Sequence, residues 1–107
     1  MSIILWKDLQ KITDVVCKKF NLKYNSLIPE TRNRAFFFGA CISTSKGKNI
    51  CLRIHQKGKP RKPLAKSTIL HTLSHELAHL KYWKHGKDHN KFQKEILRFI
   101  KDKGFGD

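Results

Sequence analysis

"LSHELAHLKYWKHGKDHNKF", residues 73–92, holds four of the six histidines in the chain. Each residue of an α-helix turns by about 100° around the helix axis, so this stretch separates into two arcs. The leucines at 70, 73, 77 and 80 share one arc, and the opposite arc carries His71, His75, Ala78, His79 and Tyr82. The leucine arc predicts a core-facing helix that begins between Pro63 and Ser67 and runs to about Trp83 or Lys84.

Two of these histidines have the spacing of zinc ligands. His75 and His79 lie one helical turn, about 6 Å, apart, so their imidazoles can converge on one Zn²⁺ with bonds of about 2.0–2.1 Å. Glu76 projects about 100° further round, beside a metal-bound water rather than on the metal. HELAH is therefore an H-E-x-x-H arrangement, which predicts one zinc ion per chain held by His75 and His79. Glu76 is the predicted catalytic residue, taking a proton from the zinc-activated water and delivering one to the leaving amine.

The third zinc ligand has two candidates, because a catalytic zinc needs three protein ligands and one open position. If the helix continued through residue 85, His85 would point off the metal face and lie about 9 Å beyond His79, so it reaches the metal only if the chain turns first. His89 lies just inside the next predicted helix, which can fold back over the site. Spacing alone leaves both open. Of the remaining histidines, His71 is expected to pack against or support the site, and His55 to lie on the surface.

The first half of the chain predicts a helix followed by a hairpin. Residues 3–20 place one helical face on Leu5, Leu9, Ile12, Val16 and Phe20. Residues 21–34 are rich in turn formers and predict a loop. The apolar run RAFFFGACIS (34–43) and the alternating run ICLRIH (50–55) predict the two strands of a hairpin, the second strand half-buried. Two prolines in residues 56–63 predict a basic loop after it.

A third helix is predicted from near Asp88 to Gly104, with Gly86 ending the helix before it. One side of this third helix carries Phe92, Ile96, Phe99 and Ile100. The order helix, hairpin, helix, helix predicts an α+β fold. With 107 residues and no sign of a boundary, the chain is expected to form a single domain over residues 1–107.

The composition is strongly basic, with 23 Lys and Arg against 8 Asp and Glu and a formal net charge of +15. Attraction to nucleic acid is one interpretation of this charge. The other is a solvated, lysine-rich surface. We favour the second, because only five of the basic residues are arginine, the better reader of phosphates and bases, and the lysines form no dense block.

The cysteines and the apolar runs bear on the compartment. Cys17, Cys41 and Cys51 form no C-x-x-C pair and are odd in number, so we expect free, buried thiols rather than a disulfide scaffold. No apolar run approaches the ~18 residues of a membrane span, and the start MSIILWKDLQ meets charge too early for a signal peptide. A soluble, cytoplasmic protein is expected.

The histidine-rich stretch also resembles known families. Residues 71–92 closely, and 34–100 loosely, resemble the minigluzincins, very small zinc metallopeptidases. HGKD, residues 85–88, is similar to the third-ligand segment of SprT-like peptidases, where a histidine after H-E-x-x-H is followed four positions on by an aromatic residue. These resemblances imply a compact, zincin-like minimal domain with His85 as the third zinc ligand, although His89 stands at the aromatic position. The minigluzincins also imply latency, imposed by the third helix or the tail KDKGFGD (101–107), within one chain or across a homodimer.

The sequence therefore predicts a zinc-dependent metalloendopeptidase that acts on peptides or proteins, in an active or a latent zymogen form. ICLRIH is expected to offer an edge for strand addition by the substrate, and Tyr82 is one candidate donor to the oxyanion. Two alternatives stay open. One is a zinc-containing, nucleic-acid-associated SprT-like protein, and the other is a non-catalytic zinc module closed by four histidines.

Overall fold

The computed structural model describes residues 4–29, 39–56 and 59–105, with residues 55, 56 and 59–63 described by their backbone alone. The elements in chain order are α1 (Trp6–Phe20), β1 (Ser26–Pro29), β2 (Gly39–Thr44), β3 (Gly47–Leu52), β4 (His55–Gln56), β5 (Lys59–Pro63), α2 (Lys66–Ala78) and α3 (Lys87–Asp102). The predicted α+β class is confirmed. None of the helices in the described part of the chain is long and apolar enough to cross a membrane.

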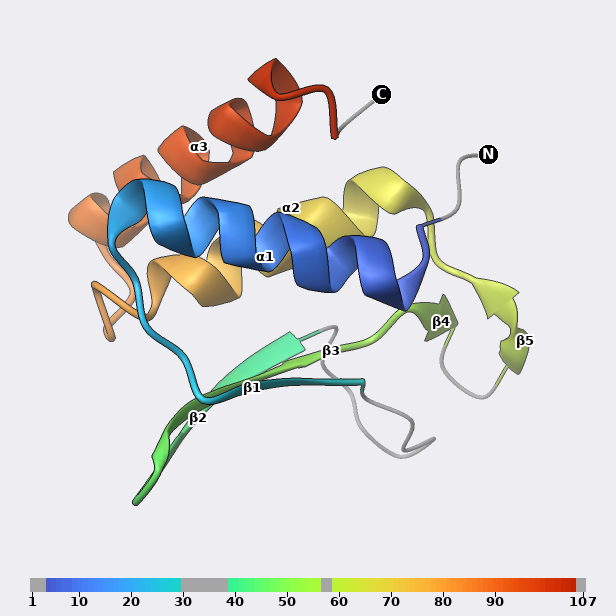
Figure 1. Cartoon of the computed structure of the whole chain (residues 1–107), viewed down its shortest axis with the longest axis horizontal. Coiled ribbons are helices and arrows are strands. Elements are labelled where there is room, and N and C mark those ends of the chain that lie inside the picture. Colours follow the sequence, from blue (N-terminus) through green and yellow to red (C-terminus); the bar gives the residue numbers. More distant parts are fainter. Residues whose placement is uncertain (1–3, 30–38, 57–58, 106–107) are drawn as a thin grey trace.

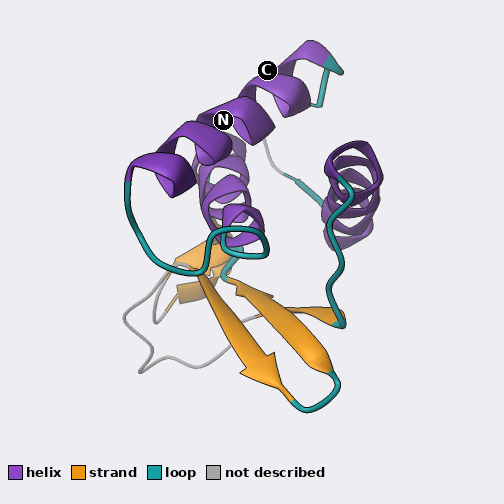
Figure 2. Cartoon of the chain, turned by 90° about the vertical axis from the view of Figure 1, so that its left-hand side faces the viewer, coloured by secondary structure: helices purple, strands orange, loops and turns teal. Residues whose placement is uncertain are grey.

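The three helices form a layer on one side of a three-stranded sheet (Figures 1 and 2). The sheet has the order β1-β3-β2, with β3 parallel to β1 and antiparallel to β2. Helix α2 contacts β2 and β3, while α3 packs on α2 and α1. Helix α2 is therefore held between the sheet and the other helices, which places its histidine face beside the β2 edge.

The core fills the space between these two layers. Its fully buried side chains from α1, β3, α2 and α3 are Leu9, Val16, Ile50, Leu52, Ile69, Leu73, Leu77, Ile96 and Ile100. Phe20 at the end of α1 packs edge-to-face on Phe92 and Phe99 of α3, with ring centroids 5.3 and 5.6 Å apart. The leucine arc predicted for α2 and the apolar side predicted for α3 are therefore the core faces of these helices.

The first helix is shorter than predicted at its N-terminus. It begins at Trp6, so Leu5 is the preceding cap residue and its side chain is 56% exposed. The prediction that Leu5 joins the core face was wrong, because a residue outside the first turn does not follow the helical period. Asn21 ends the helix in the left-handed conformation, with φ of 56°.

The predicted loop over residues 21–34 contains a strand. Residues 26–29 form β1, which lies parallel to β3 with Leu27 opposite Ile50. This pairing makes β3 the central strand, so the prediction that ICLRIH offers a free edge was wrong. Cys51 is buried, as expected of a free thiol, and Arg53 on the same strand run is buried as well. The local sequence did not signal β1, because a parallel partner lies far along the chain and four residues carry little periodicity.

The hairpin itself is confirmed, with different bounds. Strands β2 and β3 pair from Gly39 with Leu52 to Thr44 with Gly47. The predicted first strand began at residue 34, and positions 34–38 lie outside the described residues. Residues 56–63 were predicted to be a basic loop, whereas Gln56 belongs to β4 and Lys59–Pro63 form β5, the two strands of a second small sheet. Prolines fit there because each strand of a two-stranded sheet has an unpaired edge.

The end of α2 departs most from the prediction. The helix ends at Ala78, five residues before Trp83, and Gly86 caps the start of α3. The amides of His79 and Leu80 bond three residues back, to Glu76 and Leu77, which tightens the last turn. The chain then turns toward α3, where the Tyr82 ring packs edge-to-face on Phe92 at 5.8 Å.

The three cysteines are free thiols, as predicted. Cys41 lies opposite Ile50 and Cys51 opposite Ala40, so the hairpin does not place the two cysteines face to face. Cys17 and Cys51 are buried, whereas Cys41 is partly exposed.

Candidate metal centre

Three imidazoles converge where α2 ends. His75 comes from the last turn of α2, His79 caps that helix, and His85 comes from the turn that leads to α3. Their Nε2 atoms lie 3.0 Å apart for His75 and His85, 3.1 Å for His79 and His85, and 3.3 Å for His75 and His79. Tetrahedral zinc with bonds of about 2.0–2.1 Å requires nitrogens about 3.3–3.4 Å apart. The three nitrogens therefore lie close to the separation that a single zinc ion needs, with two of the three pairs slightly nearer.

Hydrogen bonds to the outer ring nitrogens determine which nitrogen each imidazole offers. His79 Nδ1 lies 3.2 Å from the backbone carbonyl of Tyr82, and His75 Nδ1 lies 3.0 Å from Oε1 of Gln93. Carbonyl oxygens only accept, so both rings carry their proton on Nδ1. Each then directs the lone pair of Nε2 to the shared point, the arrangement usual for histidines that bind a metal.

The protonation state of His79 also suits a ligand. Burial lowers the pKa of His79 below its ordinary value of 6.5, and nearby His89 adds to the effect. The ring is therefore neutral at pH 7, and a metal binds the neutral form of imidazole.

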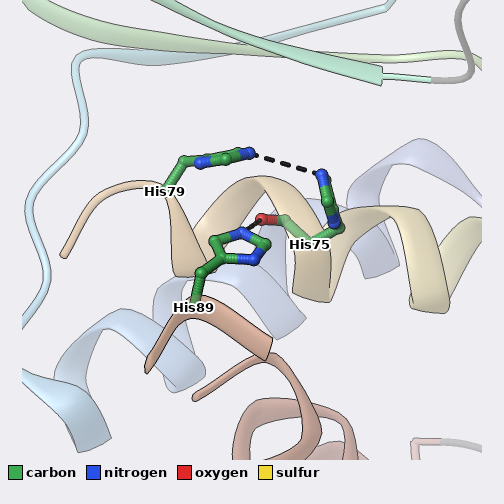
Figure 3. Close-up of side chains that lie close together, drawn as sticks. All are labelled: His75, His79 and His89. Atoms are coloured by element: carbon green, nitrogen blue, oxygen red, sulfur yellow. Dashed lines mark hydrogen bonds between the residues drawn. The ribbon is translucent and has the colours of Figure 1, made fainter. Parts of the chain in front are cut away.

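His89, the other candidate for third ligand, points from α3 toward His75 and His79, with its ring centroid 4.6 and 4.1 Å from theirs (Figure 3). It is fully buried, and its Nε2 donates to the carbonyl oxygen of His75 at 3.0 Å. A second trio, of His75, His79 and His89, has ligand atoms within 4.8 Å of one another. The trio with His85 is tighter, at 3.0–3.3 Å. We take this tighter trio as the candidate site, and His89, whose Nδ1 has no partner among the described residues, stays the alternative third ligand.

Glu76 lies at the same pocket as these rings. The pocket has a volume of about 220 Å³ and is lined by Cys41, Glu76, His79, Trp83 and His85. Only 6% of the Glu76 surface is exposed, and this burial raises its pKa from 4.5 to about 7. A carboxylate with a pKa near the working pH is suited to accept a proton and to return it.

Gly39 allows the sheet to approach Glu76, and the sequence analysis did not single it out. A Cβ at residue 39 would lie 2.6 Å from Cγ2 of Thr72 and 3.2 Å from Cγ of Glu76. Any side chain there would push β2 away from α2. The available signal was a glycine inside an apolar strand run, which often marks a close approach.

The remaining residues singled out in the sequence lie in different places relative to this pocket. Tyr82, the candidate oxyanion donor, packs against the core on Phe92 and does not line the pocket. Trp83 lines it instead, with Lys48 Nζ 4.9 Å from a ring centroid. The predicted supporting residue His71 is exposed on α2, and its Nε2 lies 3.4 Å from Nε2 of Gln93. The side chain of His55 lies outside the described residues.

The C-terminal tail lies away from this pocket. Gly104 and Phe105 line a separate cavity of about 180 Å³, together with Ile4, Ile12 and Lys66. Lys66 is the first residue of α2, whereas His79 follows its last. The described part of the tail therefore contributes no side chain to the pocket that holds Glu76.

Known structures share this fold. The crystal structure of Wss1 from Saccharomyces cerevisiae is 20% identical with a TM-score of 0.72, over 91% of this chain and 79% of that one. A Wss1 mutant structure from the same organism is 18% identical with a TM-score of 0.68, over 97% and 89% of the two chains. No curated protein matches the sequence significantly. Residues 18–102 match the WLM domain, so the chain belongs to the WLM domain family, a Wss1-like family related to the SprT-like zinc metallopeptidases.

Proposed function

We propose that this chain is a zinc-dependent metalloendopeptidase in which His75, His79 and His85 hold one Zn²⁺ and Glu76 is the catalytic base. The observation that carries the proposal is the trio of Nε2 atoms, 3.0–3.3 Å apart, at the pocket lined by Glu76. Membership of a family related to zinc metallopeptidases supports it.

The chemistry divides between the ion and the chain. A zinc ion, when bound, lowers the pKa of a coordinated water to about 7 and polarises the scissile carbonyl. Glu76 accepts the proton of the attacking water on a carboxylate oxygen and then delivers it to the nitrogen of the leaving amine. Its pKa of about 7, raised by burial, supports both transfers because neither protonation state is strongly favoured at neutral pH.

We propose the outer edge of β2, rather than β3, as the place where an extended peptide binds. Among the described strands β2 pairs with β3 alone, and Cys41 of β2 lines the pocket. A peptide that adds to the outer edge of β2 by main-chain hydrogen bonds would therefore pass beside Glu76.

The proposal is tested with Glu76→Gln. Purified protein is expected to hold about one equivalent of zinc, since the trio supplies three ligands and leaves one position open. Glu76→Gln keeps the metal and abolishes cleavage of an unfolded protein substrate, measured by gel and mass spectrometry. Glu95→Gln, on the exposed side of α3, serves as the matched control and leaves the zinc content and the cleavage activity unchanged. Undiminished cleavage by Glu76→Gln would remove Glu76 from the mechanism.

One observation favours the nucleic-acid alternative. Lys23, Lys46 and Lys48 line a cavity of about 210 Å³, and Lys48 also contacts Trp83 at the metal pocket. A polyanion bound there would lie next to the proposed site. A mobility shift with duplex DNA that weakens as salt rises would support this alternative, and no shift at low salt would dismiss it.

The non-catalytic alternative requires a fourth protein ligand. His89 is the histidine named for that role, and its Nε2 is engaged by the His75 carbonyl. Its Nδ1 has no partner among the described residues, so this nitrogen is the atom that would close the site. X-ray absorption of the zinc-loaded protein tests it, since four histidine nitrogens with no oxygen ligand would favour a closed, structural site.

Latency is the finer expectation from the minigluzincin resemblance. Neither α3 nor the described part of the tail lines the pocket, so the form of latency that we propose is a homodimer in which one tail reaches the partner's site. Removal of residues 101–107 would then raise the cleavage rate and convert dimer to monomer in sedimentation. A monomer whose activity does not change on truncation would end this expectation.

A further inference from the structure

Gln93 links two histidines of the neighbouring helix. It lies on α3, half-buried, with Oε1 3.0 Å from Nδ1 of His75 and Nε2 3.4 Å from Nε2 of His71. His71 and His75 are one turn apart on α2, so the amide of Gln93 spans both from the facing helix. These contacts form a row of three side chains, His71, Gln93 and His75, and the last of them belongs to the proposed metal trio.

The chemistry of an amide gives this row a direction. One end of the Gln93 side chain only accepts a hydrogen bond, and the other end only donates. His71 receives the donor end, which turns the acceptor Oε1 toward His75. His75 must then carry its proton on Nδ1, and its Nε2 is left with a lone pair.

The reversed amide would have the opposite effect. An NH₂ group facing Nδ1 of His75 would favour the tautomer with its proton on Nε2. That proton would lie among nitrogens only 3.0 and 3.3 Å away, those of His85 and His79, where a cation is to be held. The orientation of one side-chain amide therefore favours or disfavours the tautomer of His75 that can bind a metal.

His79 differs in this respect. Its Nδ1 bonds to a backbone carbonyl, that of Tyr82, which cannot reverse and which no substitution of Tyr82 removes. Of the two H-E-x-x-H histidines, His75 is thus the one whose tautomer depends on another side chain.

We propose that Gln93, oriented by His71, is a positioning residue that holds His75 in the Nδ1-protonated tautomer and at the ring angle the metal requires. The inference rests on the proposed function, since His75 is taken as a ligand there. Loss of a partner of this kind typically weakens metal binding by about 10–100-fold.

The test compares Gln93→Met with Gln93→Glu. Methionine keeps the length of the side chain and removes the acceptor, while glutamate keeps an acceptor oxygen for His75. Lys94→Met, on the adjacent residue at the same surface, is the matched control. The measurements are zinc affinity by competition with a chelator, and the tautomer of His75 from ¹⁵N NMR of the metal-free protein.

We expect Gln93→Met to bind zinc about 10–100-fold more weakly and to show His75 with a larger share of Nε2-protonated ring. Gln93→Glu and Lys94→Met stay within about threefold of the parent chain and keep the Nδ1-protonated tautomer. Parent-like affinity and tautomer in a folded Gln93→Met would overturn the inference.

His71→Leu provides a second arm if Gln93→Met does not fold. It leaves Gln93 in place but frees its amide to reverse, so the share of Nδ1-protonated His75 falls and zinc binding weakens. An unchanged tautomer in His71→Leu would remove His71 from the inference. If the parent chain binds no zinc, the proposed function fails. The tautomer of His75 in the metal-free protein would still test the role of Gln93.

Discussion

His85 and His89 are four residues apart, yet their surroundings are opposite. His85 is exposed and its Nε2 lies about 3 Å from two other imidazoles. His89 is fully buried, bonds to a backbone carbonyl, and is left with an Nδ1 that has no partner among the described residues. We therefore propose His85 as the metal ligand and His89 as a buried contact between α2 and α3.

Substitution of each by alanine should separate these roles. We expect His85→Ala to lose about a hundredfold or more in zinc affinity, because one of three ligands is gone. Its metal-free stability should change by less than about 0.5 kcal/mol, as is usual at exposed positions. His89→Ala should instead keep zinc and lose about 2–4 kcal/mol of unfolding free energy, from a buried cavity and a broken hydrogen bond.

Metal analysis and urea unfolding of the two variants provide the measurement. The assignment of the third ligand would be reversed if folded His89→Ala lost its zinc while His85→Ala retained it.

Glu76 should make the metal-free protein less stable as pH rises. Burial raises the pKa of Glu76 from 4.5 to about 7. The contribution of this carboxyl group to the stability of the folded protein is therefore fully present below pH 4.5 and is lost as the pH increases through 7. The Glu76→Gln side chain carries no charge to desolvate. Above pH 7 the free energy of unfolding of this variant should therefore exceed that of the parent chain by up to about 3 kcal/mol.

Urea unfolding between pH 4 and 8, with a chelator present, measures this difference. Glu95→Gln, at an exposed position, should show no such pH dependence. A difference between Glu76→Gln and the parent that stays constant over this range would contradict the burial effect.

At the scale of elements, the contact of β2 with α2 depends on the missing side chain of Gly39. Gly39→Ala should cost about 1–3 kcal/mol and lower cleavage, because its Cβ would collide with Thr72 and press on Glu76. Thr72→Ser removes the colliding methyl and keeps the hydroxyl that bonds to Thr68.

The double variant Gly39→Ala with Thr72→Ser should therefore recover part of the lost stability. Denaturant unfolding of the single and double variants forms the cycle, with Thr72→Ser alone as the control. Equal losses in Gly39→Ala with and without Thr72→Ser would show that this contact is not the cause.

The same scale shows what the sequence could predict. Local periodicity was sufficient for α2, α3 and the hairpin, and the H-E-x-x-H spacing for the convergence of His75 and His79 with Glu76 beside them. No local signal marks the early end of α2, which is followed by a contact of Tyr82 with Phe92 of another helix. The same holds for β1, whose parallel partner lies far along the chain. Gln93 was missed because its contact with His75 spans 18 residues and two helices.

For the whole molecule, the net charge of +15 opposes compactness. Raising sodium chloride from about 10 to 150 mM screens this repulsion and should increase Tm by about 4 °C, if screening contributes about 1 kcal/mol. Thermal unfolding followed by circular dichroism measures the shift, with lysine-acetylated protein as a control that should respond less. A Tm that falls with salt would show that attractive ion pairs outweigh the repulsion.

Ile4 and Phe105 line one cavity at the start of α2, far along that helix from the imidazoles. An affinity tag or a fused reporter joined at either end would therefore emerge on the side away from the metal pocket. The same proximity suits circular permutation, with the old ends joined by a short flexible peptide and new ones opened at Ser45 and Lys46, in the exposed turn of the hairpin.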